Sequence, residues 1–133
     1  MAMKIDHIGI AVESIEKVAQ FYKDLELDIC HTEEVKDQQV KASMIMIGES
    51  RIELLESLSP EGPIGKFIAK KGPSIHHIAI EVQNLEAKLK ELEEKGYSLI
   101  DKTPRMGAGG NKIAFVHPKS SGGVLIELCE KCK

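Results

Sequence analysis

The chain has 133 residues, 42% of them hydrophobic and 29% charged, which predicts a single globular domain with a buried core. Eighteen lysines and arginines against 21 acidic residues give a net charge of −3, and this balance disfavours nucleic-acid and membrane-surface binding. Aromatic residues are scarce at 4%, and no apolar run resembles an export signal or a membrane span, so we expect a cytoplasmic protein.

The first part of the chain is predicted to form a strand, a helix and three further strands. Residues 5–12 alternate between two faces, which is typical of a strand. Ser14 is a predicted helix N-cap, because apolar residues follow it at helical spacing. The three later strands are expected near residues 26–32, 38–47 and 50–57.

The same order of elements follows in the second part of the chain. The segment 60–63 breaks the strand pattern, and a short helix after it ends at Gly72. A strand is predicted at 75–82, and Asn84 caps a helix that stops at Gly96. The last three strands are expected near residues 97–101, 111–117 and 123–129.

Two short segments of the first part recur in the second. Residues 7–12 match residues 77–82 at four of six positions, and residues 52–54 match residues 126–128. Both matches keep the same order, which predicts an α+β protein built as one domain from two tandem βαβββ modules. The expected parts are module 1, a connecting helix and module 2, at about residues 3–58, 60–72 and 74–130.

Each predicted module carries one histidine and one glutamate that point away from its helix-packed face. His7 and His77 lie on the polar side of the first strands, and Glu53 and Glu127 on the polar side of the last strands. Any one of them alone suits an ordinary surface or core contact. If the two sheets form one curved mixed surface, however, the four side chains converge. Two imidazoles and two carboxylates suit a divalent transition metal with positions open for substrate or water.

The other histidines and the cysteines carry weaker signals. His76 has the wrong strand parity for a ligand, and His31 lies among charged residues, where we expect it to be solvated. Cys30, Cys129 and Cys132 are odd in number, which disfavours a disulfide framework. The C-x-x-C at the end of the chain lacks the second pair of a zinc ribbon and the context of a thioredoxin site, so reduced thiols are expected.

Beyond these patterns, the chain resembles the vicinal oxygen chelate superfamily and, within it, the methylmalonyl-CoA epimerase family. The resemblance covers nearly the whole sequence. The motifs shared widely in the superfamily are residues 6–12 and 75–79. The more specific motifs are residues 107–110, 115–119 and 122–128. Further matching segments are residues 21–22, 52–56 and 63–68.

This resemblance implies that His7, His77 and Glu127 bind one divalent metal ion per chain, with Glu53 at the position of a fourth ligand. The implied metal is Co²⁺, with Zn²⁺, Mn²⁺ or Ni²⁺ as alternatives. The implied reaction interconverts (2R)- and (2S)-methylmalonyl-CoA by removal of the C2 proton, with the metal as Lewis acid for the enolate. The implied partners are a small acyl-CoA substrate and a second copy of the chain, with no nucleic acid or membrane.

Epimerisation requires a base on each face of the planar intermediate. Glu127 is the predicted catalytic base. Some relatives carry a second glutamate on the third strand, but residues 40–47 contain no carboxylate and the matching position is Ala42. Lys41, Glu49 and a metal-bound water are left as candidates for the second base.

A glycine-rich loop and the segment after it are candidates for substrate binding. Backbone amides of such a loop can hold a carboxylate or phosphate, and nearby cations can meet the phosphates of CoA. The alternative is an ordinary hairpin loop with solvated cations. The predicted substrate-binding residues are His117, Lys119, Gly109 and Gly110, with Arg105 and Lys112 as further cations.

Three other functions within the superfamily stay open. Lactoylglutathione lyase (glyoxalase I) has the ligand order His-Glu-His-Glu, which this chain satisfies. A ring-cleaving dioxygenase uses two histidines and one glutamate on iron, usually in a longer, doubled chain. A metal-free binding module for small molecules is the third, although such modules typically lack the ligand set.

Overall fold

The computed structural model describes residues 3–131, which fall into two compact units. The N-terminal unit comprises residues 7–76, and the C-terminal unit comprises residues 3–6 and 77–131. None of the helices in the described part of the chain is long and apolar enough to cross a membrane.

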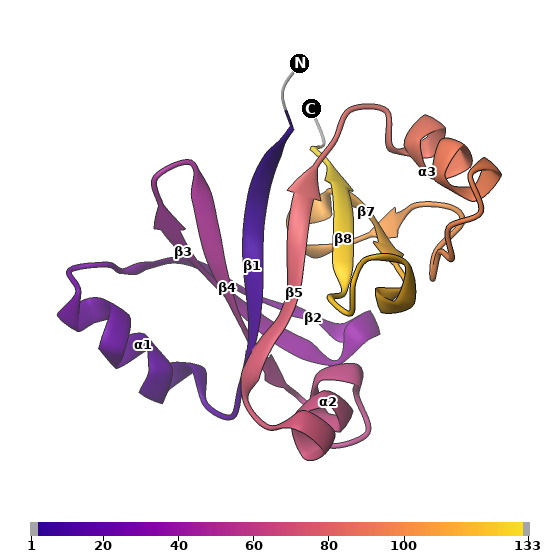
Figure 1. The fold of residues 1–133 in the computed structure, drawn as a ribbon. Helices are drawn as coiled ribbons and strands as arrows, with labels where there is room; N and C mark the ends of the chain where they lie inside the picture. The colour runs from indigo at the N-terminus through magenta and orange to yellow at the C-terminus, as the bar shows by residue number, and fades with distance from the viewer. Residues whose placement is uncertain (1–2, 132–133) are drawn as a thin grey trace. The chain divides into compact units, whose positions relative to one another are not determined.

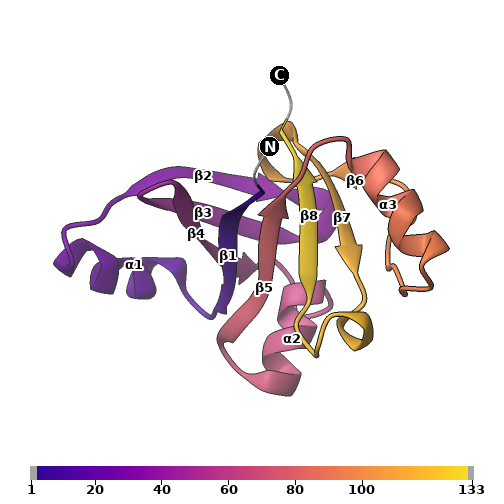
Figure 2. The same ribbon diagram turned by 45° about the horizontal axis from the view of Figure 1, so that its top comes forward.

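The N-terminal unit has a mixed four-stranded sheet in the order β2-β3-β4-β1. Strand β1 is parallel to β4, whereas β3 is antiparallel to both β2 and β4. Figure 2 shows β2, β3 and β4 side by side. The elements in chain order are β1 (Lys4–Val12), α1 (Ile15–Asp24), β2 (Ile29–Val35), the 3₁₀ turn η1 (Lys36–Gln38), β3 (Val40–Ile47), β4 (Ser50–Ser57) and α2 (Pro63–Lys71) (Figure 1).

Helices α1 and α2 pack against different residues of this sheet, because neighbouring strand residues point to opposite faces. Leu54 belongs to an apolar cluster with Val12, Ile45 and Ile15 of α1. The next residue, Leu55, belongs to a different cluster. Its other buried members are Ala11, Val40, Ala42 and, from α2, Ile64. The prediction that residues 52 and 54 face a helix is therefore confirmed, and that helix is α1. Helix α2 covers part of the opposite face of the sheet.

The C-terminal unit has the strand order β5-β8-β7-β6. Strand β5 is parallel to β8, and β7 is antiparallel to β8 and β6. Leu85 and Leu89 of α3 are fully buried and pack against Ala114, Val116 and Leu128. The elements are β5 (Ser74–Glu81), α3 (Leu85–Glu94), β6 (Arg105–Met106), η2 (Ala108–Gly110), β7 (Lys112–Val116), η3 (Pro118–Ser120) and β8 (Ile126–Glu130).

Three predicted strands differ from the structure. The strand expected at 123–129 begins at Ile126, because residues 118–124 form η3 and the turn after it. The strand expected at 97–101 is absent apart from one isolated bridge at Leu99, and a two-residue strand, β6, lies after it. There the carboxylate of Asp101 accepts the amide hydrogen of Phe115 at 2.9 Å and takes the place of a backbone ladder bond. The strand expected at 26–32 begins at Ile29, because the end of α1 continues through a turn in which the Leu27 amide bonds the Tyr22 carbonyl.

Each unit also has a glutamate side chain that holds the start of its helix, a contact that the sequence did not predict. Glu56 of β4 accepts the backbone N–H of Ile15 at 2.7 Å, and Glu130 of β8 accepts that of Leu85 at 2.8 Å. Both glutamates come three residues after a predicted metal ligand. The repeated Glu-x-x-Glu was therefore the available signal, and these contacts support the duplication.

Replacing Glu56 with alanine is expected to lower the free energy of unfolding by about 1–2 kcal/mol. The change leaves the first amide of α1 without its charged acceptor, which also stabilises the positive end of the helix. Urea unfolding followed by circular dichroism measures the effect. Glu13→Ala, at an exposed position just before the helix cap, is the matched control and should shift stability by less than about 0.5 kcal/mol. Equal effects of the two substitutions would contradict this role of Glu56.

Candidate metal centre

The first predicted His–Glu pair lies within the N-terminal unit. His7 of β1 and Glu53 of β4 point to the same face, since Gly9, two residues after the histidine, is the register partner of Glu53. His7 Nε2 lies 3.3 Å from Glu53 Oε1, and both side chains are only 6% exposed. The parallel pairing of β1 with β4 in this register brings the imidazole and the carboxylate together.

The second pair repeats this arrangement within the C-terminal unit. Ala79, two residues after His77, is the register partner of Glu127. His77 Nε2 lies 3.2 Å from Glu127 Oε1, and the side chains are 4% and 7% exposed. The ring of Phe115 on β7 meets the imidazole edge-on, with 5.9 Å between the ring centres. The two modules thus present the same pair of side chains in the same register.

The chemistry of these side chains fits a metal ion. His7, His77 and Glu127 are buried and each offers one ligand atom of a kind that divalent transition metals accept. Burying an imidazole and a carboxylate in each module costs free energy that a purely structural pair would rarely recover. A cation that both groups coordinate would offset that cost.

Residues 6–115 match the model of the Glyoxalase/Bleomycin resistance protein/Dioxygenase superfamily. The chain belongs to this superfamily. The α+β class and the repeated βαβββ arrangement expected from the sequence are confirmed by this match and by the observed elements.

Similar proteins of this superfamily include methylmalonyl-CoA epimerases. The human mitochondrial methylmalonyl-CoA epimerase is 35% identical over 94% of this chain and 72% of its own length. YqjC of Bacillus subtilis, an uncharacterized protein, is 43% identical over 96% of this chain and 91% of its own length. A solved structure of methylmalonyl-CoA epimerase in complex with methylmalonyl-CoA and NH₄⁺ is 34% identical, with a TM-score of 0.93 and coverage of 99% and 96% of the two chains.

The predicted substrate-binding segments form an ordered turn and loop in the C-terminal unit. His117 Nδ1 accepts the backbone N–H of Lys119 at 3.1 Å and so caps the turn η3, while both residues are exposed. Gly109 and Gly110 have φ angles of 75° and 76°, a region that favours glycine. The backbone bond from the Gly107 amide to the Asn111 carbonyl, 2.9 Å long, closes the loop.

Two of the cations predicted to meet CoA phosphates already contact carboxylates. The Nε of Arg105 lies 3.4 Å from Asp101, and its guanidinium carbon lies 5.2 Å from the centre of the Phe115 ring. Lys112 Nζ lies 3.2 Å from Glu86. These contacts are at the surface, where ion pairs stabilise little, so a phosphate could still compete for either cation.

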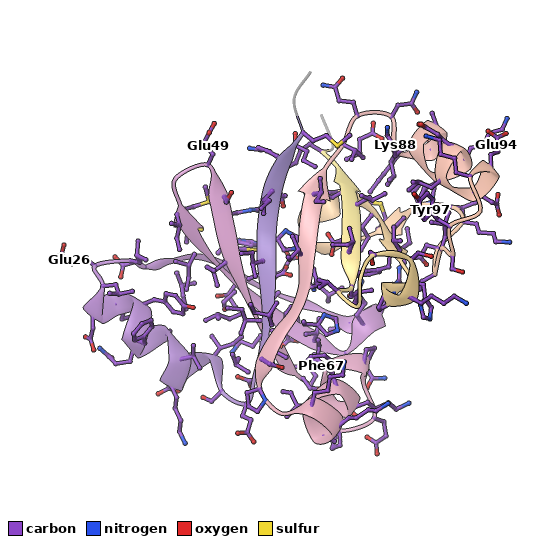
Figure 3. The ribbon with its side chains drawn as sticks, viewed as in Figure 1. Glu26, Glu49, Phe67, Lys88, Glu94 and Tyr97 are labelled. Atoms are coloured by element: carbon purple, nitrogen blue, oxygen red, sulfur yellow. The ribbon has the colours of Figure 1, made fainter. Side chains whose placement is uncertain are left out.

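The structure argues against two of the candidates for a second base. Lys41 of β3 pairs in register with Glu56, whose carboxylate caps α1, so both residues lie on the α1 side of the sheet. Glu53 points to the opposite face. Glu49 lies in the turn between β3 and β4, and its side chain extends away from the hairpin tip into solvent (Figure 3).

Two further side-chain contacts escaped the sequence-based prediction. Buried Asp6, next to His7 in β1, has its carboxylate 2.6 Å from Lys131 Nζ. This pair ties the start of β1 to the residue that follows β8, and the Asp-His dipeptide was its only sequence signal. His76 meets Phe67 of α2 edge-on, with 4.8 Å between the ring centres.

The cysteines that the structure describes are reduced thiols. Cys129 is buried, and burial together with the negative charges of Asp6 and Glu127 raises its pKa to about 12. The thiol therefore stays protonated at neutral pH, which disfavours metal binding or nucleophilic chemistry there. Cys30 is exposed, and Cys132 lies outside the described residues.

Proposed function

We propose that this protein is a metal-dependent epimerase that interconverts (2R)- and (2S)-methylmalonyl-CoA. The observation that carries the proposal is the pair of buried His–Glu contacts, repeated in one register. It occurs in a chain that resembles methylmalonyl-CoA epimerases over nearly its full length. His7, Glu53, His77 and Glu127 together would hold one divalent ion.

The resemblance to the family favours Co²⁺, with Zn²⁺, Mn²⁺ and Ni²⁺ as alternatives, since imidazole and carboxylate donors accept several divalent ions. When bound, the ion supplies Lewis-acid chemistry at the substrate carboxylate and thioester oxygens. Contacts between side chains orient the donor atoms of His77 and Glu127. Glu127 is held 3.2 Å from His77, and Phe115 packs against the edge of that imidazole.

Glu127 is proposed as the base that removes the C2 proton. The C2 proton lies between a carboxylate and a thioester carbonyl, which makes it acidic enough for a carboxylate base within reach. The apolar residues around Glu127 restrict water beside it, which favours proton transfer to the carbon rather than to solvent. These neighbouring residues are Ala79, Ile113 and Phe115.

The acyl-CoA contacts are proposed for the exposed turn and loop of the C-terminal unit. His117 and Lys119 lie together at η3, and Gly109 and Gly110 shape the loop before β7. A homodimer in the cytoplasm is the expected form of the enzyme, on the resemblance to its family alone.

Proton exchange at C2 tests the proposal. The purified protein, loaded with Co²⁺, is incubated with each form of methylmalonyl-CoA in D₂O, and NMR follows the loss of the C2 proton. We expect exchange and epimerisation, with one bound ion per chain by elemental analysis. Metal-loaded protein that leaves C2 unexchanged but isomerises the hemithioacetal of methylglyoxal would instead be a glyoxalase I. Failure to bind any divalent ion would favour a metal-free binding module.

A further inference from the structure

We propose that Glu33 of β2 is the second proton-transferring residue, held in position by His31. This inference rests on the proposed epimerase function and supplies the carboxylate that residues 40–47 of β3 lack. It follows from the strand register, the contact between the two side chains and their exposure.

The register places Glu33 on the ligand-bearing face of the N-terminal sheet. Glu33 lies directly opposite Ala42, which lies opposite Leu55, two residues from Glu53 on β4. Directly opposite residues of antiparallel strands point to the same face. Glu33 therefore shares a face with Ala42 and Glu53, one strand beyond the position where some relatives carry a glutamate.

The neighbours of Glu33 on β2 confirm its direction. Thr32 bonds the hydroxyl of Ser43 at 2.8 Å, and Ser43 lies opposite Leu54 in the α1-facing part of the sheet. Val35 packs against the cluster of Ala42 and Leu55 on the opposite face. Since strand residues alternate, Glu33 points the same way as Val35 and away from Thr32.

A β-bulge creates this arrangement. Ile29 lies opposite Ile45 and faces α1, and strict alternation would turn His31 and Glu33 to that same side. The register shifts between Ile29 and His31, so Cys30 is one extra residue in β2. The side chains of the later β2 residues therefore point to the opposite face from the one that strict alternation predicts. Bulges that redirect side chains are over-represented next to active sites.

The two redirected side chains form a contact that solvent can reach. His31 Nε2 lies 3.0 Å from Glu33 Oε1, and the side chains are 57% and 31% exposed. Glu53 on the same face is only 6% exposed. A ligand entering from solvent can therefore reach the Glu33 carboxylate, while the imidazole restricts the rotamers of that carboxylate.

The proposed step transfers one proton. As the C2–H bond breaks, the proton passes to the Glu33 carboxylate, and the bonding electron pair moves into the thioester carbonyl to give the planar enolate. In the reverse direction the protonated Glu33 returns the proton to C2, and the carbonyl reforms. Glu33 serves one face of the enolate, and a second base serves the other.

The test is Glu33→Gln, which keeps the shape of the side chain and removes the base. Epimerisation by the Co²⁺-loaded variant should fall by at least about 100-fold. Exchange of the C2 proton with D₂O should persist from one configuration of methylmalonyl-CoA and be lost from the other, since one base remains. Glu34→Gln is the matched control, because Glu34 lies next to it, opposite Lys41, on the α1 side of the sheet. It should keep exchange from both configurations.

Two results would overturn the assignment. Epimerisation by Glu33→Gln at the wild-type rate would show that Glu33 moves no proton. Equal loss of exchange from both configurations, with an unchanged circular dichroism spectrum, would show a role in binding instead. If the wild-type protein exchanges the C2 proton of neither configuration, the epimerase function itself is refuted, and the role of Glu33 falls with it. This failure is seen without any substitution, which distinguishes it from a failure of the Glu33 assignment alone.

His31 acts in this proposal as a positioning residue. His31→Asn should lower kcat by about tenfold to a hundredfold and leave KM unchanged, because a displaced base affects the proton transfer and not substrate binding. A rise in KM at constant kcat would contradict the positioning role.

Discussion

Replacing His77 with alanine is expected to abolish C2 proton exchange and to weaken metal binding by more than about 100-fold. Losing a residue that only hydrogen-bonds to a metal ligand already lowers metal affinity by about 10- to 100-fold, and His77 is proposed as a ligand itself. The imidazole is buried and lies 3.2 Å from Glu127. Its loss removes one donor and deprives a buried carboxylate of that contact, which is costly. Elemental analysis of the dialysed protein and NMR of methylmalonyl-CoA in D₂O measure the two effects.

The neighbouring histidine provides a matched control. His76 packs against Phe67 of α2 and is not part of either His–Glu pair. His76→Ala should retain the ion and the exchange activity, with only a modest fall in melting temperature. If His77→Ala keeps its metal, or if both variants lose it equally, His77 is not a ligand.

Glu127→Gln is expected to have the second largest effect. The amide is nearly isosteric with the carboxylate and retains an oxygen that can coordinate a metal, but it cannot accept the C2 proton. We expect kcat to fall by about 10²- to 10⁴-fold, the usual contribution of a general base. Stopped-time assays of epimerisation, with metal content measured on the same samples, check this result.

The repeat supplies the control for this substitution as well. Glu53 has the same register and similar burial in the other module, and glutamine at that position would keep an oxygen donor. Glu53→Gln should keep the ion and lose no more than about tenfold in kcat. Equal losses in the two variants would mean that both glutamates act only as ligands and that Glu127 is not the base.

Much of the candidate site could be predicted from local patterns. Alternation along β1 and β5 assigns His7 and His77 to the face opposite the aliphatic residues, and the same rule assigns Glu53 and Glu127. Ser14 and Asn84 were predicted as helix caps, and each accepts a backbone N–H at 3.3 Å. These features depend on residues within a few positions of one another, so local sequence is sufficient for them.

Features that depend on partners far along the chain could not be predicted in this way. The bulge at Cys30 is defined only by the pairing of β2 with β3. It turns His31 and Glu33 away from the α1 side of the sheet, to which strict alternation would assign them. The contact between Asp101 and Phe115 likewise replaced a predicted strand.

The sequence alone determined that a near-neutral chain of 133 residues is a duplication, with one His–Glu pair in each copy. Only the tertiary structure decided that each pair is in contact and buried, that Glu56 and Glu130 cap helices, and which face Lys41 and Glu33 occupy. The reason is that side-chain direction along a regular strand follows from its period of two, whereas register, bulges and long-range acceptors follow from which strands pair.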